Sequence, residues 1–218
     1  MTKGKILLRN GCVLTLEPKI GNYPKGDVLI EDGRISEIGE TIKVRDAEQI
    51  DATDTIVMPG FVDAHRHAWH SLFRNTGRTP EERPWPDPEL LESDDVYAAT
   101  LAGLLGALEA GITTVVDWAD VSLDRDRRDA ALQAHTDSGL RTLLVQPMGR
   151  DPGPFKELVS STRPGPTTTI AAGSVEPDQS NLDEVARDLL AARDLGLRIH
   201  APAGTGAAGA GALAELAG

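Results

Sequence analysis

The hydrophobic pattern of the chain changes character near residue 57. Before that point, apolar and polar residues alternate in short runs such as KILLRNG, CVLTL and DVLIEDGRISEIG. Alternation with a period of two is typical of half-buried strands, and the Asp32-Gly33 pair between two such runs indicates a hairpin turn. The pattern predicts that residues 1–57 form a small β-sandwich segment.

From residue 58 onward, short continuous apolar runs alternate with helical stripes. Apolar residues recur with helical spacing between Tyr97 and Leu108 and again between Leu182 and Ala192, which is typical of amphipathic helices. The runs between the stripes are strand candidates: IVMPGFVDAH, TTVVDWA, RTLLVQPM, TTIAAGS and LRIHAPA. This alternation predicts an α/β region with a parallel sheet over residues 58–218.

Glycines mark the ends of the predicted helices. Gly111, Gly139 and Gly196 each stand between a helical stripe and the next apolar run, where a left-handed residue commonly ends a helix. With Gly165 they indicate one βα unit per roughly 30 residues. Because an eight-unit barrel needs about 250 residues, we expect residues 58–218 to form an incomplete TIM-like (β/α) barrel of about five βα units. The alternative is an open doubly wound sheet.

An incomplete barrel has two expected consequences. Its first and last strands have unpaired edges, which favour pairing with another chain. The apolar side chains of Val115, Leu144 and Ile170 are expected to face the barrel interior without cover. The expected partner is therefore a second copy in a homo-oligomer, or a complementing chain that supplies the remaining strands.

The segment PGFVDAHRHAWHSLFR carries the clearest candidate chemistry. His65 and His67 are two residues apart at the end of a predicted strand, so strand alternation places both imidazoles on one face. Two neutral imidazoles at the carboxyl end of a barrel strand form half of a zinc or iron site. An H-x-H pair alone is weak evidence, because surface histidines also occur at this spacing.

The context of this pair resembles the amidohydrolase superfamily, in its cytosine deaminase and chlorohydrolase branch. The resemblance rests on DVLIEDGRISEIG followed by IDATDTIVMPGFVDAHRH, with Pro59 and Gly60 before the first barrel strand. It implies a TIM-like barrel flanked by a β-sandwich, and a divalent metal that activates water. The implied activity is hydrolysis of a C–N bond in a small cyclic substrate, by deamination or a related reaction.

Carried over residue by residue, the resemblance makes His65, His67 and His200 the metal ligands, with zinc expected and iron as the alternative. A Glu three residues after the third His commonly moves protons in the deaminase branch, but Ala203 stands there. A further His and an Asp belong to later strands, which we expect to lie beyond residue 218. The catalytic residues are therefore unassigned, the substrate is open, and we expect little or no turnover from this chain alone.

Other polar and aromatic residues near strand ends are candidates for substrate contact. Trp69, His70 and Gln146 are the predicted substrate-binding residues, each with ordinary packing as the alternative. His135 lies in the helical stretch RRDAALQAHTDSGL, where we expect a solvated side chain rather than a ligand. The proline-rich residues 78–88 indicate a lid or a surface loop. Further pocket candidates after the second strand are Asp117, Trp118 and Asp120.

Composition narrows the partners and the compartment. The chain has 22 Lys plus Arg against 34 Asp plus Glu, for a net charge of −12, which disfavours nucleic acid and anionic membrane surfaces. Cys12 is the single cysteine, which fits a reducing compartment. We expect neither secretion nor membrane spanning, because the first residues MTKGKILLRN carry no continuous apolar run of the kind that a secretory leader needs and nowhere do 18 consecutive apolar residues occur, so the expected location is cytoplasmic. The expected partner of the site is a small-molecule substrate.

Two functional hypotheses remain open from the sequence. The first is a metal-dependent hydrolase that depends on His65, His67 and His200. The second is a non-catalytic remnant or half-barrel subunit that pairs with another chain, and it depends on the residues that the chain lacks.

Overall fold

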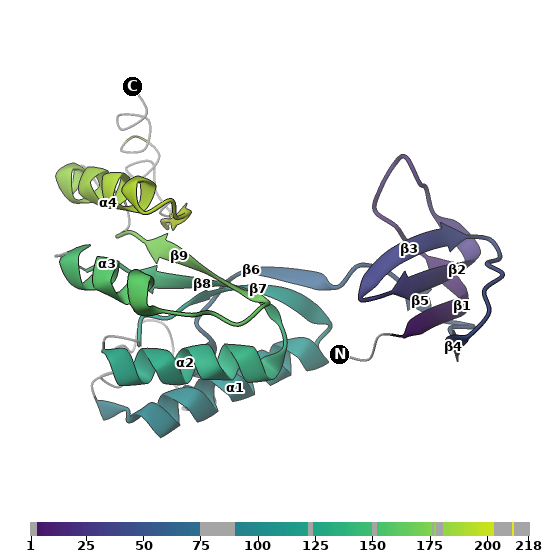
Figure 1. Cartoon of the computed structure of the whole chain (residues 1–218), viewed down its shortest axis with the longest axis horizontal. Coiled ribbons are helices and arrows are strands. Elements are labelled where there is room, and N and C mark those ends of the chain that lie inside the picture. Colours follow the sequence, from purple (N-terminus) through teal and green to yellow (C-terminus); the bar gives the residue numbers. More distant parts are fainter. Residues whose placement is uncertain are drawn as a thin grey trace. The chain divides into compact units, whose positions relative to one another are not determined.

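The computed structural model describes residues 4–74, 90–121, 124–149, 152–175, 177, 181–202 and 211. By its internal contacts the chain divides into two compact units, Met1–Gly60 and Phe61–Gly218 (Figure 1). The proline-rich residues 78–88, which the sequence indicated as a lid or loop, lie outside the described residues, as does Ala203. Among the residues that are described, no helix is long and apolar enough to cross a membrane.

The first unit is a five-stranded sheet, so this part of the chain is all-β; that residues 1–57 belong to a β-sandwich stays a prediction. Its order is β3-β2-β1-β4, with β5 also paired to β1. The hairpin between β2 and β3 turns at Asp32 and Gly33, whose φ values of 51° and 75° are both positive, as the predicted turn requires. A small core of Leu7, Leu29 and Ile42 fills one face. The strands are β1 (Lys5–Val13), β2 (Tyr23–Glu31), β3 (Arg34–Gly39), β4 (Ala47–Asp51) and β5 (Ile56–Val57).

The second unit is a parallel sheet whose strands follow one another in the order β10-β9-β8-β7-β6. A doubly wound sheet reverses its strand order at a switch point, whereas a barrel adds strands in sequence. The described order has no reversal, which confirms the incomplete TIM-like barrel. The elements are β6 (Phe61–Arg66), η1 (Ala68–Phe73), α1 (Ser93–Glu109), β7 (Ile112–Trp118), α2 (Arg125–Ser138), β8 (Arg141–Pro147), α3 (Pro152–Ser161), β9 (Thr168–Gly173), α4 (Leu182–Asp194) and β10 (Ile199–His200).

Residues with a preference for helix ends occupy the ends of the observed helices. The side chain of Asp124 accepts a hydrogen bond from the Arg127 amide at 3.0 Å and caps the start of α2. After the helices, Gly111, Gly139 and Gly196 have φ values of 81°, 70° and 65°. These glycines therefore occupy the left-handed positions that their spacing predicted.

The expectation that Val115, Leu144 and Ile170 face the barrel interior is wrong. Val115 packs against Leu104 of α1, Leu144 packs against Leu132 of α2, and Ile170 lines the same small space as Leu144 and Leu132. All three belong to the layer between the sheet and its helices, which lie along the strands in Figure 1. Strands that are apolar on both faces carry no signal for which face is inside.

The opposite face of the sheet carries its own apolar cluster. Trp118, Val145 and Ala171 pack together there, with Val116 and Leu143 beside them. These residues come from the middle strands β7, β8 and β9, one position out of phase with the helix-facing set. This concave face also carries the histidines of the candidate site.

Candidate active site

Three histidines converge from the two edge strands of the described sheet. His65 lies on β6, His67 directly follows it, and His200 ends β10. The ring centroids of His65 and His67 are 5.1 Å apart, and those of His65 and His200 are 6.0 Å apart. The edges of a flat five-stranded sheet would be roughly 19 Å apart at a spacing of about 4.8 Å per strand. The sheet must therefore curl strongly, with these imidazoles pointing inward.

Trp118, at the end of β7, lies among these histidines. Its indole Nε1–H donates to Nδ1 of His200 at 2.7 Å, and its ring centroid is 5.9 Å from that of His65. Because an indole can only donate, Nδ1 of His200 accepts, and the neutral ring carries its proton on Nε2. Burial, and then the neighbouring His65, lower the pKa of His200. Both effects favour the neutral imidazole that a metal requires.

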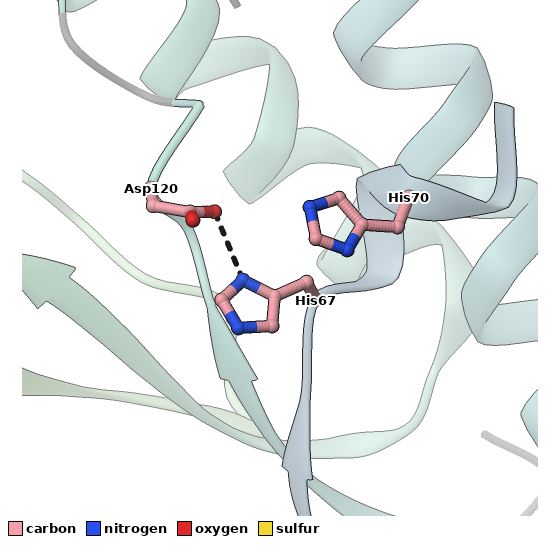
Figure 2. A group of neighbouring side chains, drawn as sticks. All are labelled: His67, His70 and Asp120. Carbon is pink, nitrogen blue, oxygen red and sulfur yellow. Dashed lines mark hydrogen bonds and ion pairs between the residues drawn. The ribbon is translucent and has the colours of Figure 1, made fainter. Parts of the chain in front are cut away.

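The carboxylate of Asp120 orients the imidazole of His67, the second histidine of the H-x-H pair. Its Oδ1 contacts Nδ1 of His67 at 3.1 Å (Figure 2) and accepts the indole N–H of Trp69 at 2.6 Å. Burial by itself raises the pKa of Asp120, but the His67 and Trp69 interactions outweigh it and the net shift is downward. An ionised carboxylate only accepts, so Nδ1 of His67 carries a proton and Nε2 is left with a lone pair for a metal.

His70 lies beside His67 and defines a second possible grouping. The ring planes of His67 and His70 are nearly parallel, at 8°, with centroids 4.7 Å apart (Figure 2). Potential ligand atoms of His67, His70 and Asp120 all lie within 4.8 Å of one another. Parallel stacked rings direct their in-plane lone pairs side by side rather than toward one point. One ring would therefore have to turn before this group could hold an ion.

The peptide that follows His67 is held from two directions. The amide of Ala68 donates to Oδ1 of Asp117 at 2.7 Å. On its other side, a Cβ placed on Gly103 of α1 would lie only 2.4 Å from the Ala68 carbonyl oxygen. The absence of a side chain at Gly103 thus lets α1 approach the turn that carries His67 and His70.

Asp117 is itself held by a buried histidine. Its Oδ2 lies 2.9 Å from Nε2 of His135, and Nδ1 of His135 lies 3.1 Å from Oγ1 of Thr142. The prediction that His135 is solvated is wrong, because its side chain is fully buried. A signal was present in the sequence, since the small residues Ala131 and Ser138 flank His135 at helical spacing and mark the buried face of α2.

The predicted substrate-binding residues lie in different environments. His70 is half-buried beside His67, whereas the Trp69 indole is 2% exposed and packs against Val96 and Val121. Gln146 is buried on the helix-facing side of β8, next to Arg128 and Leu144. The structure thus brings Trp69 and His70 to the histidine cluster and does not bring Gln146 there.

The fold and the site together define a TIM-like barrel with a histidine cluster at the carboxyl ends of its strands. The chain belongs to the amidohydrolase family, whose sequence pattern matches residues 56–213. This result agrees with the H-x-H pair, the strand order and the convergence of His65, His67 and His200.

Curated relatives with similar sequences are named as deaminases. The chain is 37% identical over 145 residues to a 5'-deoxyadenosine deaminase of Methanosarcina acetivorans, covering 64% of this chain and 32% of that protein. It is 32% identical over 153 residues to a 5-methylthioadenosine/S-adenosylhomocysteine deaminase of Pelotomaculum thermopropionicum, covering 66% and 34%. The chain thus spans about a third of the length of the curated relatives that it matches.

Solved structures share the fold at low sequence identity. An amidohydrolase from a Sargasso Sea environmental sample has a TM-score of 0.75 at 18% identity, covering 97% of this chain and 55% of that one. An adenosine deaminase from Xanthomonas campestris with bound zinc has a TM-score of 0.73 at 20% identity, covering 91% and 49%. At this level of identity the likeness supports the fold alone.

Proposed function

We propose that this chain carries the metal-binding first part of an active site that hydrolyses a C–N bond in a small cyclic substrate. The observation that carries the proposal is the convergence of His65, His67 and His200 from opposite edges of the described sheet. Neutral imidazoles are suitable ligands for zinc, which is the proposed metal, with iron as the alternative. When bound, such an ion supplies Lewis acidity that makes water a nucleophile near neutral pH.

The surrounding residues have distinct proposed tasks. Asp120 orients His67 by accepting its Nδ1–H, and the buried Trp69 holds Asp120 in place through its indole N–H. Trp118 covers the apolar side of the histidine cluster. His70 is the proposed substrate contact, because its ring is half-buried and borders His67. Gln146 has no role in this proposal, since it lies on the other face of the sheet.

The proposed substrate class is adenine nucleosides. The relatives named above act, by their names, on 5'-deoxyadenosine and on 5-methylthioadenosine or S-adenosylhomocysteine. Deamination replaces an exocyclic amino group by oxygen from water, which is a C–N hydrolysis of the kind that the site supports. The resemblance to the cytosine deaminase branch left the ring of the substrate open, and the proposal favours a purine ring over a pyrimidine ring.

Zinc binding tests the proposed ligand set directly. Dialysed protein is titrated with zinc in competition with a chromogenic chelator, and three variants are compared. His65→Ala and His200→Ala should weaken zinc binding strongly, whereas His70→Ala should leave it nearly unchanged. If His70→Ala abolishes zinc binding while His65→Ala does not, the metal belongs to the His67, His70 and Asp120 group and the proposed ligand set is wrong.

Ammonia release tests the substrate class separately. Zinc-loaded protein is assayed with 5'-deoxyadenosine, 5-methylthioadenosine and cytosine. Turnover above about 1 s⁻¹, near the low end of ordinary enzymes, is not expected, because Ala203 replaces the proton-transferring Glu. Residual release from the nucleosides that disappears in His65→Ala supports the proposal. A preference for cytosine contradicts the substrate class without affecting the metal site.

A second candidate function is a subunit that pairs with another chain. In the described sheet β6 and β10 each pair on one side only, and Phe61 and Val62 of β6 are exposed. Unpaired strand edges favour association. Light scattering of the purified chain tests this function, for which a dimer or larger species is expected and a monodisperse monomer would be contrary evidence.

A further inference from the structure

A groove rich in arginine lies beside α2 of the second unit, on the helix side of the sheet rather than on the face that carries the proposed metal ligands His65, His67 and His200. It has a volume of about 240 Å³ and runs between α2 and the residues that end and follow α3. Three arginines and one carboxylate line it, together with several hydroxyl groups. The charged residues are Arg125, Arg128, Arg163 and Asp129.

Arg128 is the unusual member of this groove. Its side chain is only 12% exposed, and its closest ion pair among the described residues joins Nε to Oδ1 of Asp129 at 3.8 Å. No hydrogen-bond acceptor in the described part of the chain reaches that buried Nε. Burial lowers the pKa of Arg128, and the neighbouring Arg125 acts in the same direction, while Asp129 and Asp124 oppose the shift without reversing it. A buried guanidinium is costly unless an anion accepts its hydrogen bonds.

The single carboxylate of Asp129 does not balance the positive charges of the two arginines beside it. Its other oxygen, Oδ2, lies 3.6 Å from Nε of Arg125. One carboxylate is therefore shared between two guanidinium groups, with both nitrogen–oxygen distances longer than a normal hydrogen bond. The third cation, Arg163, is anchored by hydrogen bonds from Nη1 to the carbonyl oxygens of Ser160 and Thr162, each at 3.1 Å. The groove thus has a local excess of positive charge in a chain whose net charge is −12.

We propose that this groove binds a phosphate group, either as inorganic phosphate or as the phosphomonoester of a small metabolite. Planar guanidinium groups donate paired hydrogen bonds to phosphate oxygens. Thr136 and Thr162 border the same space, and the Thr136 hydroxyl already donates to the Leu132 carbonyl oxygen at 3.0 Å, so the arginines are the donors on which the proposal depends. A monocarboxylate has only two acceptor oxygens and one negative charge. It would therefore pair with three guanidinium groups less completely than a phosphate does. The site is separate from the proposed metal centre and does not depend on it.

The test is a calorimetric titration of the purified chain with inorganic phosphate at constant ionic strength, accompanied by thermal unfolding. Arg125→Gln and Arg128→Gln are compared with Arg193→Gln, which removes a 71% exposed arginine of α4 outside the groove. Phosphate should raise the melting temperature of wild type and Arg193→Gln, by binding the folded state. Each groove variant should bind about tenfold more weakly, since each loses a charge-assisted hydrogen bond.

A second titration with ribose 5-phosphate distinguishes the two sources of phosphate. Tighter binding of the ester identifies a phosphorylated metabolite, and equal binding identifies the phosphate group alone. If Arg128→Gln does not fold, Arg125→Gln tests by itself whether the groove binds phosphate. The side chain of Arg125 is 74% exposed, so its replacement leaves the core intact. The proposal is overturned if neither compound binds, or if both groove variants bind phosphate as wild type does.

Discussion

Trp118 donates its indole N–H to Nδ1 of His200 at 2.7 Å, and this bond competes with a metal for that histidine. A ligand nitrogen needs a free lone pair, and the neutral ring has one only at Nδ1, where the indole already binds. Whichever nitrogen of His200 ligates, the bond to Trp118 must break. The indole N–H of Trp118 therefore competes with the metal for His200, the third proposed ligand.

Replacing Trp118 by a residue without an N–H donor should tighten metal binding. We predict that Trp118→Phe binds zinc severalfold more tightly than wild type, because a net hydrogen bond of about 1 kcal/mol no longer has to be broken. Zinc should also change the tryptophan fluorescence of wild type, and this change should be smaller in the variant. Unchanged or weaker zinc binding in Trp118→Phe would contradict this competition between the indole and the metal.

The orientation of His67 should depend on Asp120. We predict that Asp120→Ala lowers zinc affinity by about 10- to 100-fold, the usual cost of removing a carboxylate that orients a metal-bound histidine. Asp120→Asn should fall between this variant and wild type, because its amide oxygen still accepts a hydrogen bond. Asp94→Ala, at an exposed position of α1, is the matched control. Chelator competition measures all four proteins, and wild-type affinity in Asp120→Ala contradicts the proposed role.

Two glycines of α1 should respond in opposite ways to the same substitution. We predict that Gly103→Ala destabilises the protein, because the new Cβ would lie 2.4 Å from the Ala68 carbonyl oxygen and the turn must shift. Gly106→Ala meets nothing within 4 Å and should stabilise the helix by about 0.5–1 kcal/mol. Urea denaturation measures both. Equal effects of the two substitutions would mean that α1 does not touch the turn.

The buried histidine of α2 should be a major source of stability. We predict that His135→Ala lowers the free energy of unfolding by about 3 kcal/mol, because it leaves a cavity and deprives the buried Asp117 of a partner. Gln133→Ala, at an exposed position of the same helix, should change it by less than about 0.5 kcal/mol. A loss below about 1 kcal/mol in His135→Ala would indicate that the pair contributes little.

The sequence by itself determined the local features of this protein. Period-two alternation placed His65 and His67 on one face, and Gly111, Gly139 and Gly196 marked the helix ends. The spacing of apolar runs predicted a parallel sheet of five strands, and the Asp32-Gly33 pair predicted a hairpin. Each of these features depends on backbone preferences or on neighbours within a few residues, which a single sequence records directly.

Tertiary structure decided which residues meet across the sheet. Alternation shows that Val115 and Asp117 share a face, but not that this face meets the helices, because the β-strands are apolar on both sides. The burial of His135 against Asp117 follows from that choice of face. The convergence of His65 and His200 depends on the curl accumulated over all five strands. Curvature sums small twists between neighbouring strands, so no short stretch of sequence records the distance between the two edges.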